Sequence, residues 1–161
     1  MHELAKQIHK LLRQKFRSIA VAESCTGGQL SQALTSISGS SRCFLLGIVA
    51  YSNFAKNKVL KVPYALIDTH GAVSRAVARK MAQNVSALAK ADLGISITGI
   101  AGPTGGTKTK PVGTVFIAIA AKNKTICKRF NFKGNRTSIR KQATKETLKL
   151  IRIFLAGLKF S

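Results

Sequence analysis

The stretch Ser18–Gly28, with the sequence SIAVAESCTGG, changes from a short apolar run to a polar turn that ends in two glycines. The run predicts a buried strand over residues 18–22, because short apolar runs bounded by turn signals are typical of core strands. Leucines and alanines recur at helical spacing after the glycines, up to Ile37. A strand-turn-helix unit is therefore expected here, and it favours an α/β fold.

The remaining sequence repeats this alternation of strands and helices. An amphipathic helix is expected over residues 1–16, with Leu4, Ile8, Leu11, Leu12 and Phe16 on one face. Further strands are predicted at 44–50, 93–98, 112–121 and 125–132, and further helices at 53–59, 75–89 and 136–155. Asn53 and Ser74 are the expected N-caps of two of these helices. Residues 36–42, Pro63, His70 and the turn at Asn123 and Lys124 are read as connections. The order predicts one α/β domain over residues 1–161, with a mixed, mostly parallel sheet between helices.

The composition indicates which binding partners and which cell compartment to expect. The chain has 27 Lys and Arg against 5 Asp and Glu, a formal net charge of +22, which attracts anions such as phosphorylated metabolites or nucleic acid. Three cysteines without metal-ligand spacing argue against a disulfide framework and a zinc site. No apolar run is long enough for a membrane span and no secretory signal is visible, so a cytoplasmic protein without membrane association is expected.

Three polar segments each follow a predicted strand: Glu23–Gly28, Tyr51–Lys56 and Thr98–Gly113. If these strands are parallel neighbours, the segments meet at the sheet edge where α/β folds bind ligands. Ser24 is a candidate nucleophile at a turn whose backbone N–H groups suit an oxyanion. The alternative is that Ser24 or Thr26 only caps the helix.

A serine nucleophile needs a base, and the histidines are poor candidates. His2 and His9 lie on the terminal helix, and His70 is read as a loop residue. Lys56 is the alternative, because burial and nearby positive charge both lower a lysine pKa, although a solvated helix lysine is the ordinary interpretation. Tyr51 could donate or relay a proton or could simply pack.

The third segment is rich in Gly, Thr and Pro. This composition suits a backbone nest for a phosphate or carboxylate, or a surface loop. Neither a Walker A motif nor a GxGxxG motif is present.

These segments together resemble a known family. Residues 22–28 (AESCTGG), 51–56 (YSNFAK), 70–74 (HGAVS), 98–107 (TGIAGPTGGT) and 110–115 (KPVGTV) match, in order, the signatures of the CinA C-terminal domain family with its PncC-like amidohydrolases. The resemblance implies a three-layer α/β/α sandwich. It also implies hydrolysis of nicotinamide mononucleotide to nicotinic acid mononucleotide and ammonia, in pyridine nucleotide salvage, by a Ser-Lys mechanism without metal or cofactor.

The resemblance also implies residue roles. Ser24 is the expected nucleophile, Lys56 its base and Tyr51 a relay or orienting group. The expected substrate-binding residues are Glu23, Cys25, Thr26, Gly27, Gly28, Thr98, Gly99, Gly102, Gly105, Gly106, Arg136 and Arg140.

The sequence departs from the family pattern at Gly134-Asn135-Arg136, where Gly-Asp-Arg is common, and at Thr104 and Leu46, where Gly is common. Some members carry a further pyrophosphatase-like domain, and these 161 residues leave no room for it, so that activity is not expected.

Two competing readings stay open. One is a competence- or damage-related protein that binds nucleic acid or a partner protein, with weak sequence-independent nucleic-acid binding from its charge. The other is an inactive homologue, against which intact Ser24, Tyr51 and Lys56 argue. A homodimer is expected only because most soluble oligomers are symmetric dimers.

Overall fold

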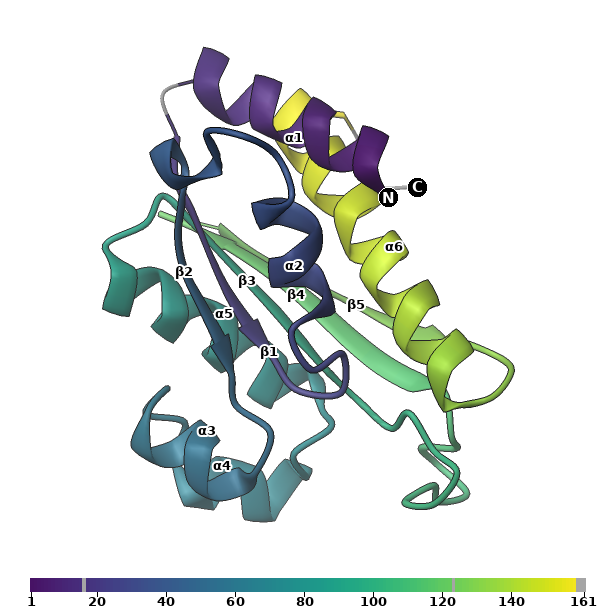
Figure 1. The fold of residues 1–161 in the computed structure, drawn as a ribbon. Helices are drawn as coiled ribbons and strands as arrows, with labels where there is room; N and C mark the ends of the chain where they lie inside the picture. The colour runs from purple at the N-terminus through teal and green to yellow at the C-terminus, as the bar shows by residue number, and fades with distance from the viewer. Residues whose placement is uncertain (16, 123, 159–161) are drawn as a thin grey trace.

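The computed structural model describes residues 1–15, 17–122 and 124–158, so Phe16 and Asn123 of the sequence predictions lie outside the described residues. Five strands form one sheet in the order β2-β1-β3-β4-β5 (Figure 1). The strands are β1 Ile19–Glu23, β2 Phe44–Val49, β3 Leu93–Gly99, β4 Thr114–Ala121 and β5 Lys124–Asn131. β1 pairs in parallel with β2 and β3, and β4 is antiparallel to both β3 and β5. The sheet is therefore mixed, with only β4 running against the other strands, as predicted.

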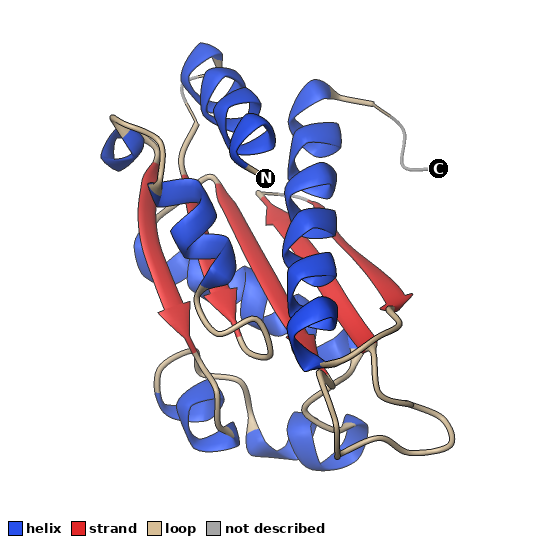
Figure 2. Cartoon of the chain, turned by 45° about the vertical axis from the view of Figure 1, so that its right-hand side comes forward, coloured by secondary structure: helices blue, strands red, loops and turns tan. Residues whose placement is uncertain are grey.

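Helices cover both faces of the sheet. On one face lie α1 (His2–Gln14), α2 (Gln29–Thr35) and α6 (Arg136–Ala156). On the other lies α5 (Arg75–Ala89), with the short α3 (Asn53–Lys58) and α4 (Tyr64–His70) beyond the carboxyl ends of the parallel strands (Figure 2). The predicted three-layer α/β/α sandwich is confirmed.

The two faces of the sheet differ in side-chain size. The face under α1, α2 and α6 presents large branched residues, among them Val21, Ile95 and Ile117. The face under α5 presents small ones, including Ala20, Ala22, Ala118 and Ala120. Gly94 shows how closely α5 lies, because a Cβ there would be 1.9 Å from the Ala82 carbonyl oxygen. Alternation along the strands thus sets which helix approaches which face.

Most predicted elements are present within one or two residues of their expected bounds, but three predictions were wrong. Pro63 does not merely punctuate the chain, because it is the N-cap of α4, whose last residue is His70. The fixed φ of proline is compatible with a helix start, and this made the signal ambiguous. Residues 40–42 form a short 3-10 helix, η1 (Ser40–Arg42), inside the predicted loop. The N-cap of α3 is Ser52 instead of Asn53, whereas Ser74 caps α5 as predicted.

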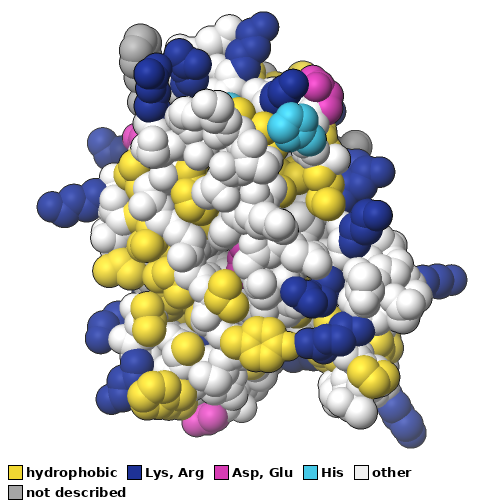
Figure 3. Space-filling view, in the orientation of Figure 1, with side chains coloured by type: hydrophobic (Ala, Val, Ile, Leu, Met, Phe, Trp, Pro, Cys, Tyr) yellow, Lys and Arg dark blue, Asp and Glu magenta, His cyan; other side chains and the backbone are white. Residues whose placement is uncertain are grey.

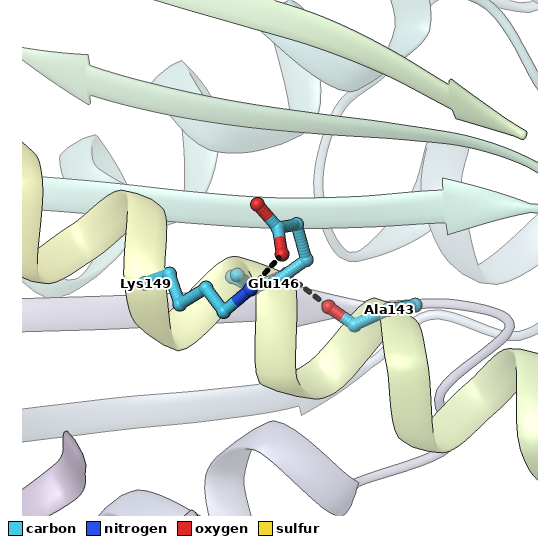
Figure 4. Close-up of polar contacts among 4 residues, drawn as sticks. Ala143, Glu146 and Lys149 are labelled. Carbon is cyan, nitrogen blue, oxygen red and sulfur yellow. Dashed lines mark hydrogen bonds and ion pairs between the residues drawn. The ribbon is translucent and has the colours of Figure 1, made fainter. Parts of the chain in front are cut away.

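On the face shown in Figure 3, Lys and Arg side chains are numerous and scattered, whereas acidic side chains are few. Among the described residues one ion pair forms, between Lys149 and Glu146 at 2.9 Å on α6 (Figure 4). On the same helix the Thr147 hydroxyl donates to the Ala143 carbonyl oxygen. The 5 Asp and Glu are thus too few to balance the 27 Lys and Arg. No helix in the described ranges is long and apolar enough to cross a membrane.

Candidate active site

Ser24 lies in a tight turn between β1 and α2, at the carboxyl end of the parallel strands. Its backbone N–H donates to the Ile97 carbonyl oxygen of β3 at 2.9 Å, and its carbonyl oxygen accepts from the Gly27 N–H at 3.1 Å. Gly27 and Gly28 have φ of 60° and 95°, in the left-handed region that favours glycine. The two glycines therefore let the chain reverse directly after Ser24 and enter α2.

Glu23 anchors this turn from inside the protein. Its side chain is fully buried, and its two carboxylate oxygens accept four hydrogen bonds, from the backbone N–H groups of Gly28, Leu30 and Ser31 and from the Ser31 hydroxyl, at 2.7–3.1 Å. These donors belong to the first turn of α2, where backbone N–H groups lack partners within the helix and the helix dipole favours negative charge. With both oxygens occupied in this way, the carboxylate holds the turn, and the predicted substrate contact by Glu23 is not supported.

Lys56 reaches Ser24 from the first turns of α3. Its side chain is 2% exposed, and Nζ lies 3.1 Å from Ser24 Oγ, 3.0 Å from the Ala50 carbonyl oxygen and 3.5 Å from the Tyr51 carbonyl oxygen. No carboxylate is among these partners. A neutral amine has two N–H bonds and one lone pair, so it can donate to both carbonyls and accept from the Ser24 hydroxyl.

Burial shifts the pKa values of the Lys56 amine and the Cys25 thiol in opposite directions. It lowers the pKa of the Lys56 amine, an effect that the nearby Cys25 only partly opposes. Burial also raises the pKa of the Cys25 thiol to about 12. Cys25 thus stays a protonated thiol at neutral pH, whereas Lys56 is shifted toward its neutral, basic form. Of the two adjacent nucleophile types, the hydroxyl of Ser24 is the one with a base.

Backbone donors remain free beside Ser24. The Gly27 N–H is engaged with the Ser24 carbonyl oxygen. The N–H groups of Cys25 and Thr26 donate to no other residue within the described parts of the chain, and the Cys25 N–H faces its own thiol. The Thr26 hydroxyl is also buried without a hydrogen-bond partner among those residues. The sequence left two alternatives for oxyanion donors, the backbone N–H groups near residues 25–27 or those of the turn over residues 98–102. In the first turn the geometry leaves Cys25 and Thr26 as the candidates.

The hydroxyl of Tyr51 is bonded to Arg136, and the Tyr51 side chain has no described contact with Ser24. Arg136 lies at the start of α6, donates from Nη1 to the Gly102 carbonyl oxygen at 2.8 Å and donates from Nη2 to the Tyr51 hydroxyl. It therefore links the segment after β2 to the glycine-rich loop after β3. Tyr51 has no described contact with Ser24, so the orienting role predicted for it is compatible with the geometry and the relay role is not supported.

Arg140, one turn further along α6, packs against the nucleophile turn. Its Nη2 and Nε donate to the Thr26 carbonyl oxygen at 2.8 and 3.3 Å, and a Cβ on Gly27 would be 2.9 Å from its guanidinium. Arg136 and Arg140 each have donors left after these bonds. The two arginines expected to bind substrate therefore lie one helical turn apart on the same face of α6.

The third predicted segment is only partly brought to Ser24. Gly99 contacts the turn, because a Cβ there would be 3.0 Å from Cys25 Sγ, and Gly102 is held by Arg136. Thr98 is directed elsewhere, since its hydroxyl donates to the Ala72 carbonyl oxygen at 2.9 Å. Gly105 and Gly106 lie in the exposed part of the loop and have no described contact with Ser24.

Three contributors were missed from the sequence. Ser31 bonds the Glu23 carboxylate, and the Ala50 carbonyl oxygen binds Lys56. Asn135, the departure from Gly-Asp-Arg, caps α6 by accepting the Ser138 N–H on Oδ1 at 2.9 Å, so the amide supplies the acceptor that an aspartate would. Only Asn135 carried a recognisable signal, as an N-cap residue. No cluster of three potential metal ligands occurs in the described residues.

Comparison with known proteins identifies the family. The sequence pattern of the CinA C-terminal domain matches residues 1–155. The chain belongs to the CinA C-terminal domain family. A putative competence-damage inducible protein from Caldanaerobacter subterraneus is 46% identical over 155 residues, and a CinA-like protein from Syntrophus aciditrophicus is 47% identical over 148 residues. These matches cover 96% and 91% of this chain but only 38% and 35% of those relatives.

Solved structures of CinA proteins share the whole fold. The competence damage-inducible protein A from Klebsiella pneumoniae has a TM-score of 0.94 and 34% identity, with 98% of each chain covered. A competence/damage-inducible protein from Agrobacterium tumefaciens has a TM-score of 0.92 and 38% identity, covering 96% of this chain and 94% of that one. The CinA family and the sandwich predicted from the motifs are both confirmed.

Proposed function

We propose that this CinA domain is an amidohydrolase that converts nicotinamide mononucleotide and water to nicotinic acid mononucleotide and ammonia, in pyridine nucleotide salvage. The observation that carries the proposal is the buried Lys56 amine 3.1 Å from the Ser24 hydroxyl. Hydroxyl and amine together form the nucleophile and base that acyl transfer requires. The substrate assignment rests on the motif resemblance and on the positive charge of the protein, which suits a phosphorylated substrate.

In the acylation step the Ser24 hydroxyl attacks the carboxamide carbon while its proton passes to Lys56 Nζ. The carbonyl oxygen becomes an oxyanion, for which the N–H groups of Cys25 and Thr26 are available; one such donor is typically worth about 3–4 kcal/mol of barrier. The Lys56 ammonium then returns the proton to the leaving nitrogen, and ammonia departs as the carbon–nitrogen bond breaks. An ester between Ser24 and the nicotinoyl group remains.

In the deacylation step water attacks the ester carbon and gives its proton to Lys56. Collapse of the second tetrahedral intermediate breaks the bond to Ser24 Oγ, and Lys56 returns the proton to that oxygen. The acid product leaves and the neutral amine is restored. Arg140 is bonded to the nucleophile turn at the Thr26 carbonyl oxygen, and Arg136 lies one turn away on α6. Both have donors left, and we assign them to the substrate phosphate.

The test is ammonia release from nicotinamide mononucleotide by purified protein, with Ser24→Ala and the exposed control Ser36→Ala alongside. We expect release by the wild type and by Ser36→Ala, and none above background by Ser24→Ala. Free nicotinamide, which has no phosphate, should be a poorer substrate. Equal rates for wild type and folded Ser24→Ala would refute the nucleophile, and no release by folded wild type would refute the substrate.

A second candidate function is binding of nucleic acid or of a partner protein in competence or damage responses. The net charge of +22, with a single ion pair among the described residues, favours attraction to DNA. Counterion release makes such binding strongly salt-dependent. If the protein is retained on double-stranded DNA at 150 mM salt and prefers certain sequences, this candidate is favoured. If it elutes from the DNA below 150 mM salt, only the weak non-specific binding predicted from the charge is left.

A further inference from the structure

A second concave site lies at the end of the sheet opposite to Ser24. It is a cavity of about 780 Å³ between α1, the loop that contains η1, and the amino ends of the parallel strands. Ser18, Cys43 and Asp92 all line it, and each immediately precedes a strand, namely β1, β2 and β3. Since β1 has five residues and a strand rises about 3.3 Å per residue, the cavity and Ser24 are separated by roughly the length of that strand.

Basic residues surround this cavity. Five of its fourteen lining residues carry positive charge: Lys6, Lys10, Arg13, Arg17 and Arg42. That share is about twice the share of Lys and Arg in the whole chain, 27 of 161. None of the five side chains forms an ion pair or a hydrogen bond within the described residues, where the one ion pair is between Lys149 and Glu146. Their charges therefore add at the cavity mouth, where Asp92 is the one acidic lining residue and feels the charge of Arg17.

The only acidic residue in the lining is already engaged. The Asp92 carboxylate accepts hydrogen bonds from the Ser18 backbone N–H and hydroxyl, both at 2.7 Å. These bonds tie the amino ends of β1 and β3 together. The carboxylate thus has a structural partner, and its single charge leaves the cavity with an excess of positive charge.

A histidine–cysteine pair holds one wall of the cavity. His9 is 5% exposed, and its Nε2 lies 2.8 Å from the Leu34 carbonyl oxygen, which can only accept, so Nε2 carries the hydrogen. Nδ1 is then the acceptor for the Cys43 thiol, 3.0 Å away. The pair connects α1, α2 and Cys43, the residue before β2.

We propose that this cavity is a second ligand site, for a small organic molecule bearing two or more phosphate charges. Its volume falls in the range of pockets that hold metabolite-sized ligands. Arginine is suited to phosphate because its planar group can form two parallel hydrogen bonds, and three arginines lie at this cavity. The proposal does not depend on the reaction at Ser24, because it uses none of the same residues.

The test uses inorganic pyrophosphate as the probe at 150 mM salt, with binding measured by calorimetry. Arg13→Gln/Arg42→Gln removes two charges from the cavity, and Lys58→Gln/Lys145→Gln removes two exposed charges elsewhere. We expect saturable binding to the wild type and the control, and binding at least about tenfold weaker in the cavity variant, since hydrogen bonds to charged groups are lost. Equal weakening in both variants, or no saturable binding to the wild type, would overturn the proposal.

Backbone NMR locates the bound probe independently. Pyrophosphate should shift the amide signals of residues 37–43 and 6–15, whether or not the signals of Ser24–Gly28, beside the arginines assigned to the substrate phosphate, also shift. Shifts confined to Ser24–Gly28 would place the probe at the catalytic site. Shifts spread evenly over the surface would mean that the net positive charge of the protein attracts the probe without a defined site. Either result would overturn the second site. Because the readout is binding, loss of amidohydrolase activity would not affect it.

Discussion

At the scale of single residues, the environment of Lys56 decides what the site can do. A lysine on a short helix is normally solvated, yet here the side chain is 2% exposed and faces two carbonyl oxygens and one hydroxyl. Burial disfavours the charged amine. The same surroundings that lower its pKa also place it against Ser24, so base and nucleophile are prepared together.

The pH dependence of ammonia release should reveal this base. Only neutral Lys56 can accept the Ser24 proton, so kcat/KM should rise with pH and then level off. The apparent pKa of the rise should lie below the ordinary lysine value of about 10.4, because burial lowers the pKa of Lys56. Rates measured from pH 5 to 10 check this expectation. A profile that is flat throughout would exclude a lysine base.

The lowered pKa has a consequence for stability, which Lys56→Met should show. In the folded protein Lys56 loses its proton at a lower pH than in the unfolded chain, so the unfolded state binds more protons between the two pKa values. The free energy of unfolding contributed by Lys56 is then greatest above the unfolded pKa and falls as pH falls through the folded pKa.

At neutral pH, methionine removes the free-energy cost of burying a lysine amine that is protonated in the unfolded chain. It also leaves the Ala50 carbonyl oxygen without its donor. We expect the free energy of unfolding of Lys56→Met, measured by urea denaturation, to lie within about 1 kcal/mol of the wild-type value at pH 7. At pH 10 the variant should be less stable relative to wild type. A loss of several kcal/mol at pH 7 would mean that Lys56 is charged and structurally required.

At the scale of elements, the sequence predicted most of the framework but not its contacts. Strand and helix periodicity located the strand ends that carry Ser24, Tyr51 and Gly99. Pro63 was misread because proline both breaks helices and starts them. The four bonds to Glu23 could not be predicted, since their donors are backbone groups of α2 whose approach depends on folding. The burial of Lys56 is likewise a product of packing.

Glu23→Gln tests the link between β1, the nucleophile turn and α2. The amide keeps one acceptor oxygen but opposes backbone N–H groups with its own N–H₂, so at least one buried donor loses its partner. We expect a loss of about 2–3 kcal/mol in the free energy of unfolding, together with slower ammonia release because Ser24 shifts. Ser31→Ala, which removes one of the four bonds, should cost about 1 kcal/mol. Equal stability of Glu23→Gln and wild type would show that the carboxylate does not anchor the turn.

At the scale of the whole molecule, the net charge of +22 restricts where two copies could meet. The β2 edge of the sheet is favourable, because residues 43–55 carry no charged side chain. Leu45 and Val49 on β2 are both 48% exposed, and no strand pairs with the outer side of β2 in the described residues. Uncharged apolar sheet edges favour pairing with another strand, whereas lysine on an edge prevents it.

The homodimer predicted from the sequence is therefore expected to use this edge. Leu45→Lys adds a charge there, and Leu88→Lys, at an exposed position on α5, is the matched control. Light scattering after gel filtration should give a dimer for wild type and Leu88→Lys and a monomer for Leu45→Lys. A monomeric wild type would contradict the homodimer, and a dimeric Leu45→Lys would place the interface elsewhere.

The most direct measurement of the central claim, that Ser24 and Lys56 act as one unit, is a double-mutant cycle on ammonia release from nicotinamide mononucleotide. Ser24→Ala and Lys56→Met should each lower kcat/KM by at least about 100-fold. The double variant should be no slower than the slower single variant, because residues of one catalytic unit are not additive. Multiplication of the two losses in the folded double variant would instead mean that the residues act separately, and would contradict the Ser-Lys mechanism.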